Sequence, residues 1–238
     1  MEAFPLPAVY AVDWRKHPNG GLVFRAIEQG ADRIVRWAGA TVDTLLTVEV
    51  PYEGTNLLLE PVTLWDVTPD GDFLLARTDE PSVELRRGGT GDLIWRARWN
   101  RPSEELDGAD VAHLVALVRN RILRDTPDVS AETLQANLAA IRYPERGPVL
   151  AGLMAAPWGD VWVRRAKPVA AMGPGALRVG SAEAFGGRIW DVLDPSGLSN
   201  GGVMLPDGFA PRRFHGDWIY GILAGDMGIE TLARVQVR

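Results

Sequence analysis

The side chains best suited to catalysis or metal binding in this 238-residue sequence are its three histidines. His17 lies in a predicted turn, His113 in a predicted helix, and His215 in a predicted loop two residues before Asp217. No second histidine stands at metal-ligand spacing from any of them, and the sequence contains no cysteine. Asp217 is of the right type to orient the His215 imidazole as a general base, but a nucleophile would have to come from elsewhere. We therefore expect solvated turn histidines and assign no catalytic and no metal-ligating residue.

Two other motifs have the residue types of active sites but fit a structural role better. Glu104 and Glu105 are neighbouring carboxylates, yet they precede a predicted helix, whose N-terminus favours negative charge. The glycine-rich stretches 173–175 and 186–187 are too short and too poor in Lys, Ser and Thr to cradle phosphate. We predict helix-terminal carboxylates and turns at these places, and no cofactor.

Short apolar stretches separated by Pro, Gly and Asp predict strands along most of the chain. In the segment 92–99 the apolar residues fall on one face and Arg96 and Arg98 on the other, the period of two that is typical of a strand. The turn signal Pro-Asp-Gly at 69–71 recurs at 206–208. The predicted strands group into four units, near residues 8–50, 62–101, 148–180 and 188–237. The third unit includes a predicted strand near 177–179.

The segment 188–237 has the clearest pattern of strands and turns. Its apolar runs lie at 189–193, 202–205, 218–223 and 231–237, with turn residues between them. Four short strands in about 40 to 50 residues is the size of one β-propeller blade.

This segment resembles the last blade of bacterial six-bladed β-propeller proteins of the NHL-like kind. Those blades combine W-x-V-x-D-x-x-G, V-x-L-P-x-G-F, D-x-I-x-G and G-I-E-x-L-x-R-V. The matching residues here are Trp190, Val192, Asp194, Gly197, Val203, Leu205, Pro206, Gly208, Phe209, Asp217, Ile219, Gly221, Gly228, Ile229, Glu230, Leu232, Arg234 and Val235. The resemblance implies a propeller that is short for six blades. It also implies a binding scaffold rather than one particular activity.

Between residues 107 and 143 the apolar period changes from that of strands to that of helices. Asp107 or Asp110 is the expected N-cap of a first helix, and Ser130 that of a second. Prolines end both periodic runs. The sequence therefore predicts a helical hairpin inserted between the strand-rich parts.

These patterns together predict an all-β fold: a propeller-like array of about four antiparallel β-sheets with an inserted helical hairpin. The expected organisation is two N-terminal blade units in 1–101, the hairpin in 102–147, and two C-terminal blade units in 148–238. A closed four-bladed ring is one alternative, and a β-sandwich with a helical arm is another.

Composition narrows the class of partner. The formal net charge is −6, and only Lys16 and Lys167 among the 25 basic residues are lysines. An acidic chain without a basic stripe argues against nucleic acid as a partner. No apolar run approaches the ~20 residues that span a bilayer, and the N-terminus lacks the pattern of a secretory signal. We expect a cytoplasmic protein, or one bound peripherally to a membrane complex.

The abundance of arginine and tryptophan favours a role in protein contacts, because these residues anchor interfaces. Strand alternation predicts that Trp158, Trp162, Arg164 and Arg165 are exposed and contact a partner. We predict a non-enzymatic structural or interaction subunit that docks onto other protein subunits of a larger assembly, including an extrinsic subunit of a membrane complex. The alternative is a propeller enzyme, a hydrolase or lyase, or a small-ligand binder with its site in the central channel.

Overall fold

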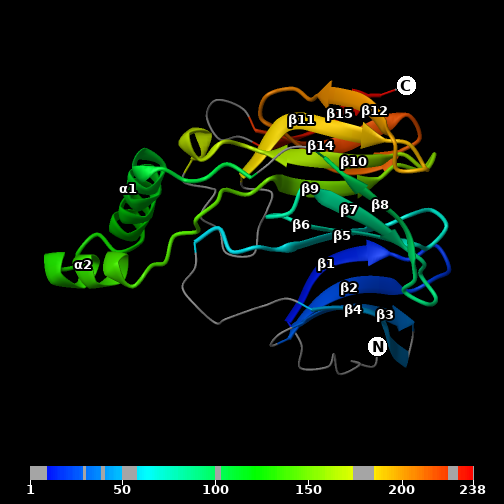
Figure 1. Cartoon of the computed structure of the whole chain (residues 1–238), viewed down its shortest axis with the longest axis horizontal. Helices are drawn as coiled ribbons and strands as arrows, with labels where there is room; N and C mark the ends of the chain where they lie inside the picture. The colour runs from blue at the N-terminus through cyan, green and yellow to red at the C-terminus, as the bar shows by residue number, and fades with distance from the viewer. Residues whose placement is uncertain are drawn as a thin grey trace.

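The computed structural model describes residues 10–28, 31–38, 41–49, 58–99, 103–173, 185–224 and 230–237. Within these residues, antiparallel strands form four sheets in a propeller arrangement, with two α-helices at one end of the sheets (Figure 1). The sheets follow one another in chain order, and the first and last lie at opposite ends of the array (Figure 1). The predicted fold class is confirmed.

The first two sheets are four-stranded meanders. The strands of the first are β1 (Tyr10–Lys16), β2 (Leu22–Glu28), β3 (Ala31–Ala38) and β4 (Thr41–Glu49). The strands of the second are β5 (Thr63–Val67), β6 (Phe73–Arg77), β7 (Ser82–Arg86) and β8 (Leu93–Arg98). The predicted turn between β5 and β6 places Gly71 at a φ of 87°, a conformation that favours glycine.

The third and fourth sheets complete the array. The strands of the third are β9 (Leu150–Ala155), β10 (Val161–Ala166), β11 (Gly186–Leu193) and β12 (Ser199–Met204). The fourth has three strands in the described part of the chain: β13 (Phe209–His215), β14 (Trp218–Ala224) and β15 (Glu230–Gln236).

The expected boundary between the last two units is wrong. Residues 188–237 do not form one sheet, because β11 pairs with β10 through registers such as Val163 with Asp191. The fourth sheet instead begins at β13, a strand that the sequence did not predict because Pro211 and charged residues interrupt its apolar pattern. The strand expected near 177–179 lies outside the described residues, as do Gly228 and Ile229 of the resemblance motif.

The two helices begin at predicted caps. Asp107 caps α1 (Gly108–Asp125): its side chain accepts the backbone N–H of Asp110, whose carboxylate accepts the N–H of Asp107. This reciprocal pair is a capping box, which satisfies N–H groups that the first helical turn leaves unpaired. Ser130 caps α2 (Ala131–Ala139) by accepting the N–H of Thr133 at 3.1 Å. No described helix is long and apolar enough to cross a membrane.

Apolar side chains fill each seam between successive sheets. The seam between the first and second sheets buries Val23, Ile34, Trp65, Phe73 and Leu75. The seam between the second and third sheets buries Leu64, Leu74, Val83, Ala151, Leu153, Val161 and Val163. The seam between the third and fourth sheets buries Met154, Trp162, Trp190, Val192, Phe209 and Ile219. Because both faces of the inner sheets are covered, their strands are apolar on both sides.

The helical hairpin projects from one end of the sheets, but its base belongs to the core (Figure 1). Leu114, Leu117 and Val118 of α1 are buried in the same cluster as Val149 and Met172. Val149 directly precedes β9, and Met172 lies between β10 and β11 of the third sheet. The α1 face that carries these three residues is therefore part of the packing of the array.

Candidate binding groove

Trp162, one of the four expected contact residues, is buried. Its side chain is 4% exposed and packs against Trp190 and Phe214 in the seam between the third and fourth sheets. The expected exposure is wrong, because a neighbouring sheet covers each face of β10 and strand alternation leaves no face of it in water.

Trp158 lies in the turn before β10 and is half-buried. Its indole Nε1 donates to the Asp160 carboxylate at 2.6 Å, and its ring meets Phe214 edge-on with 5.3 Å between centroids. These contacts fix the Trp158 indole at the rim of the seam between the third and fourth sheets.

The two arginines at the end of β10 are also half-buried and engaged within the chain. Arg164 donates to the Gly187 carbonyl at 2.8 Å and lies 5.8 Å from the ring centre of Trp190. Arg165 donates to the Asp191 carboxylate at 2.8 Å. The contact of Trp158, Arg164 and Arg165 with a partner stays a prediction.

The histidines are not brought together. His17, expected in solvent, is 5% exposed because the turn between β5 and β6 packs on its ring. Its Nδ1 accepts the N–H of Asn19 at 3.2 Å. Burial, and secondly the charge of Arg36, lowers the pKa of His17. His113 lies on α1 and His215 at the end of β13. Within the described residues, no three His, Asp or Glu side chains are grouped as a metal ion requires.

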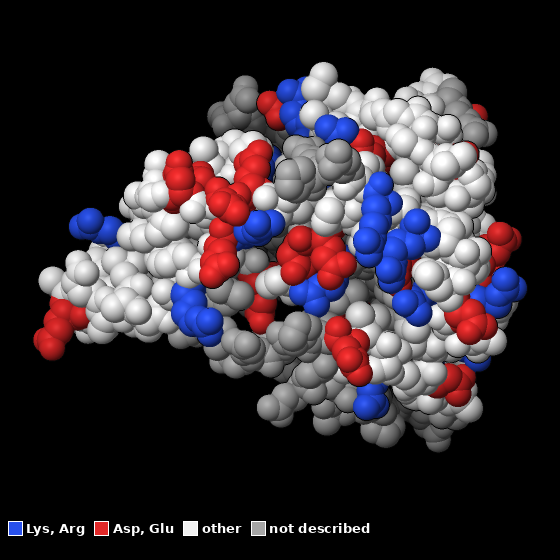
Figure 2. Space-filling model, in the orientation of Figure 1, with Lys and Arg blue, Asp and Glu red and all other residues white. Residues whose placement is uncertain are grey.

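A groove lies between the first and second sheets, away from all four expected contact residues. β4 forms one wall, residues of β6, β7 and β8 form the other, and its volume is about 330 Å³. This volume falls in the range of sites that hold small molecules or short peptide segments. Over the region of β7 and β8, Figure 2 shows a group of basic side chains beside a group of acidic ones.

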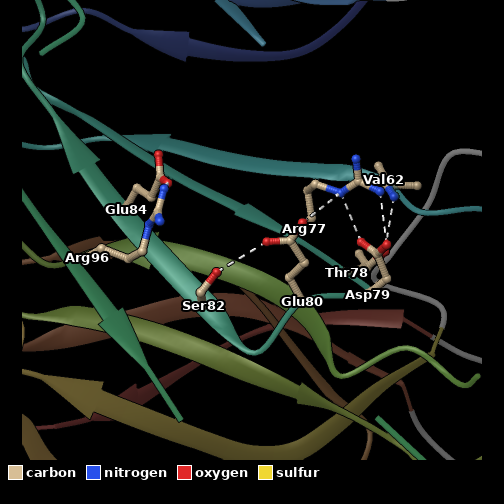
Figure 3. A network of polar contacts seen from close by, with 8 residues as sticks. All are labelled: Val62, Arg77, Thr78, Asp79, Glu80, Ser82, Glu84 and Arg96. Atoms are coloured by element: carbon tan, nitrogen blue, oxygen red, sulfur yellow. Dashed lines mark hydrogen bonds and ion pairs between the residues drawn. The ribbon is translucent and has the colours of Figure 1, made fainter. Parts of the chain in front are cut away.

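At one end of the groove Glu80, which lines it, and Asp79, which lies beside it, place two carboxylates around Arg77. Arg77, the last residue of β6, donates to Asp79 with 2.9 Å between Nη2 and Oδ2. The same guanidinium lies 3.6 Å from a Glu80 carboxylate oxygen, and Glu80 in turn accepts the hydroxyl of Ser82 at 3.4 Å. Here one cation faces two carboxylates (Figure 3).

The other end has the opposite balance. Glu84 of β7 accepts Arg86 at 2.7 Å and the Nε of Arg96 at 2.8 Å, so one carboxylate faces two guanidinium groups. Burial raises the pKa of Glu84, but the hydrogen bonds and charges of Arg96 and Arg86 outweigh it, and the net shift is downward. Glu84 is therefore a firmly ionised carboxylate that holds both arginines in place.

The two ends are separated along β7, an inner strand of the second sheet. Figure 3 shows Glu84 and Arg96 on one side, Arg77, Asp79 and Glu80 on the other, and Ser82 between them. From Glu80 to Glu84 the chain advances four residues, which span up to ~13 Å at ~3.3 Å per residue in a strand. The wall formed by the second sheet is thus electrically polarised along its length, and β4 adds the carboxylate of Glu49 from the opposite wall.

The sequence did not reveal this groove. Its alternation placed Arg96 correctly on the face opposite the apolar residues of β8, but nothing local indicated that β4 would lie across from that face. The signal that was available is the polar or charged residue at every second position in 80–86: Glu80, Ser82, Glu84 and Arg86. Such a run on a strand is usually a solvated face, and only the packing of the first sheet makes it a wall.

Comparisons with known proteins assign this chain to no family. No protein-family model matches this chain, and no curated protein matches it in sequence. The chain is similar in structure to puromycin hydrolase, with a TM-score of 0.46 and 13% identity over 98% of this chain and 28% of that one. It is similar to the hydrazine synthase of Kuenenia stuttgartiensis, with a TM-score of 0.45 and 13% identity over 94% of this chain and 45% of that one. It is also similar to virginiamycin B lyase from Staphylococcus aureus, with a TM-score of 0.42 and 11% identity over 98% of this chain and 58% of that one.

The chain therefore spans less than two thirds of the length of each of these proteins. Its architecture is that of a β-propeller-type protein with four sheets in the described residues. The six-bladed NHL-like family suggested by the C-terminal motif is not confirmed.

Proposed function

We propose that this chain is a non-enzymatic binding subunit, and that the groove between its first and second sheets holds an extended segment of a partner protein. The observation that carries the proposal is the polarisation of the groove: two carboxylates around Arg77 at one end, and two guanidinium groups around Glu84 at the other.

The separation of the two ends selects the kind of ligand. A single amino acid places its ammonium and carboxylate groups only a few ångströms apart, whereas the groove ends lie up to ~13 Å apart. An extended segment of about four residues spans that distance. Its Lys or Arg would lie near Asp79 and Glu80, and its Asp or Glu near Arg86 and Arg96. Arginine forks bind carboxylates through paired hydrogen bonds, which fixes the direction of the segment.

The partner is taken to be another protein subunit of a larger assembly, including one attached peripherally to a membrane complex. A cytoplasmic location and a place in a larger, six-bladed ring belong to the same proposal. The alternative function is a hydrolase or lyase, or a small-ligand binder, with its site in the central channel. The two functions predict different outcomes for a bound peptide. An enzyme would alter the peptide chemically, whereas a binding subunit would release the peptide intact.

The test uses three fluorescent ten-residue peptides measured by anisotropy at low ionic strength. One carries Lys four residues before Glu, the second carries them in reverse order, and the third has alanine at both positions. We expect one charged peptide to bind and the neutral one not to bind. Arg96→Glu should weaken binding at least tenfold, because it reverses the charge at the basic end.

Arg98→Glu is the matched control, since Arg98 is an exposed arginine of the same strand that does not line the groove. Equal binding of charged and neutral peptides, or wild-type binding by Arg96→Glu, would refute the proposal. Mass spectrometry of the recovered peptide separates the two functions, because the binding subunit leaves its mass unchanged.

A further inference from the structure

Within the part of the chain that the structure describes, the last strand of the fourth sheet has an open edge. Among the described residues, β15 pairs with β14 only, while the other three sheets each have four strands. The side chains of Glu230, Leu232 and Arg234 are exposed on one face of β15, and Leu232 is 77% exposed. An unpaired edge with an exposed leucine is a template for pairing with another strand.

The sequence of this edge is self-complementary. Residues 230–234 read Glu-Thr-Leu-Ala-Arg, so opposite charges stand two positions on either side of Leu232. In an antiparallel pair of identical strands related by a two-fold axis through Leu232, each Glu230 lies opposite the Arg234 of the other copy. The two leucines then lie opposite each other. Directly opposed side chains of an antiparallel pair share a face and interact.

Neighbouring registers lose this match. A two-fold axis at Thr231 places Leu232 opposite Glu230, and one at Ala233 places Leu232 opposite Arg234. In both registers an apolar side chain meets a charge and no ion pair forms between the charged residues of the segment. The pairing about Leu232 is the one that satisfies all three side chains.

Arg234 is already held in a suitable position. Its guanidinium lies 4.3 Å from the ring centre of Trp218, which is on the neighbouring strand and shares the outer face of the sheet. A cation stacked on an aromatic ring loses less side-chain freedom when it binds a carboxylate.

We propose that two copies of this chain associate through β15, edge to edge and antiparallel about Leu232. The two fourth sheets then form one continuous sheet across the two-fold axis. An interface made by one pair of edge strands is at the small end of specific protein interfaces. The fraction of dimer should therefore depend on protein concentration. The proposal is independent of the groove.

Sedimentation velocity across a concentration series tests the association. We expect a monomer–dimer equilibrium that Leu232→Lys shifts to monomer by at least tenfold in Kd. Glu230→Arg and Arg234→Glu should each weaken the dimer, because each places like charges opposite one another. The double variant Glu230→Arg/Arg234→Glu should restore it, because the pairs re-form with their signs exchanged. Leu198→Lys is the control, since Leu198 is 67% exposed and lies in the turn between β11 and β12.

A single introduced cysteine tests the register, because the chain has no cysteine of its own. Under mild oxidation Leu232→Cys should form a disulfide-linked dimer, since the two positions face each other. Thr231→Cys should not, because its partner in this register is Ala233. A monomer at every concentration refutes the proposal. So does a dimer that Leu232→Lys leaves unchanged, or a cross-link that forms equally at 231 and 232. Circular dichroism of each variant confirms that the fold is retained.

Discussion

Asp66 of the second sheet accepts the backbone N–H of Ala155 in the third sheet, with 2.8 Å between the nitrogen and Oδ2. The other oxygen of Asp66 accepts Nε of Arg15 from the first sheet at 3.1 Å. One carboxylate therefore connects three successive sheets. The connection is directional, unlike the apolar packing around it, so it specifies how the sheets are aligned as well as that they touch.

The Asp66 carboxylate should give stability a particular pH dependence. Burial raises its pKa above the ordinary 3.8, although Arg15 and two backbone N–H groups oppose the shift. A raised pKa in the folded state means that this group's contribution is full below pH 3.8 and falls as pH rises through the folded-state value. The stability of the wild-type protein relative to Asp66→Asn should therefore increase on acidification from neutral pH. Urea denaturation of both proteins at several pH values measures this difference. Asp43→Asn, at an exposed carboxylate, is the control, and a difference that shrinks on acidification contradicts the prediction.

Arg25 should contribute much more to stability than a surface arginine. Its side chain is 3% exposed, pairs with the buried Asp32 at 3.3 Å, and donates to the Thr63 carbonyl at 2.9 Å. Arg25→Ala leaves the Asp32 charge buried without this partner, and we expect a loss of about 3–5 kcal/mol in unfolding free energy. Arg36→Ala breaks an exposed pair with Asp43 and should cost about 1 kcal/mol or less. Chemical denaturation compares the two, and equal losses would contradict this account of the buried pair.

The base of the hairpin should matter for stability. Leu114 is fully buried among residues of the sheets, so Leu114→Ala should destabilise the protein by about 2–5 kcal/mol. Leu123 is on the same helix and 37% exposed, and Leu123→Ala should cost about 0.5 kcal/mol. Thermal unfolding of both variants checks the contrast. A neutral Leu114→Ala would show that α1 adds nothing to the core.

Replacing residues 108–139 by a short linker tests the division into 1–101, 102–147 and 148–238. We predict that the sheets stay folded because each seam buries its own apolar residues. Stability should fall, since Val149 and Met172 lose their cover from α1. Far-UV circular dichroism that retains the strand signal, with a lower Tm, is the expected result. Complete unfolding would mean that the three parts fold as one.

Gly221 should be intolerant of a side chain. A Cβ at this position would lie 2.3 Å from the Ala210 carbonyl oxygen and 2.8 Å from the ring of Phe209, within the pairing of β13 and β14. Gly221→Ala should cost about 2 kcal/mol or more, because the backbone must move to accommodate the methyl group. Gly108→Ala, where a Cβ meets no neighbour, should be nearly neutral. Equal Tm values for the two variants would contradict the close approach.

Local chemistry made the strands, turns and caps predictable. The Gly71 turn and the Asp107 and Ser130 caps each depend on residues close together in the chain, and all three occur as expected. The grouping of strands into sheets depends on pairing between strands that are distant in the chain. The prediction that residues 188–237 form one sheet was wrong for this reason. The apolar run 189–193 predicts the first strand of the last blade unit, whereas β11, which contains this run, pairs with β10 of the third sheet.

The candidate site could not be predicted from the sequence, because it too depends on contacts between strands that are distant in the chain. Trp162 occupies a strand position that would be exposed in a sheet with one wet face, and only the stacking of sheets on both sides buries it. Glu84 and Arg96 are twelve residues apart and meet because β7 pairs with β8. The groove above them exists because the first sheet stacks on the second.

The link through Asp66 also gives the array a mechanical property. Apolar seams resist separation but allow sliding, since burial has no preferred direction. The bonds from Arg15 and Ala155 to Asp66 oppose sliding at the first two seams, so they hold the first three sheets in one alignment. The groove lies at the first of these seams, and its two walls therefore keep a fixed register. β15 lies in the fourth sheet, beyond the seams that Asp66 links.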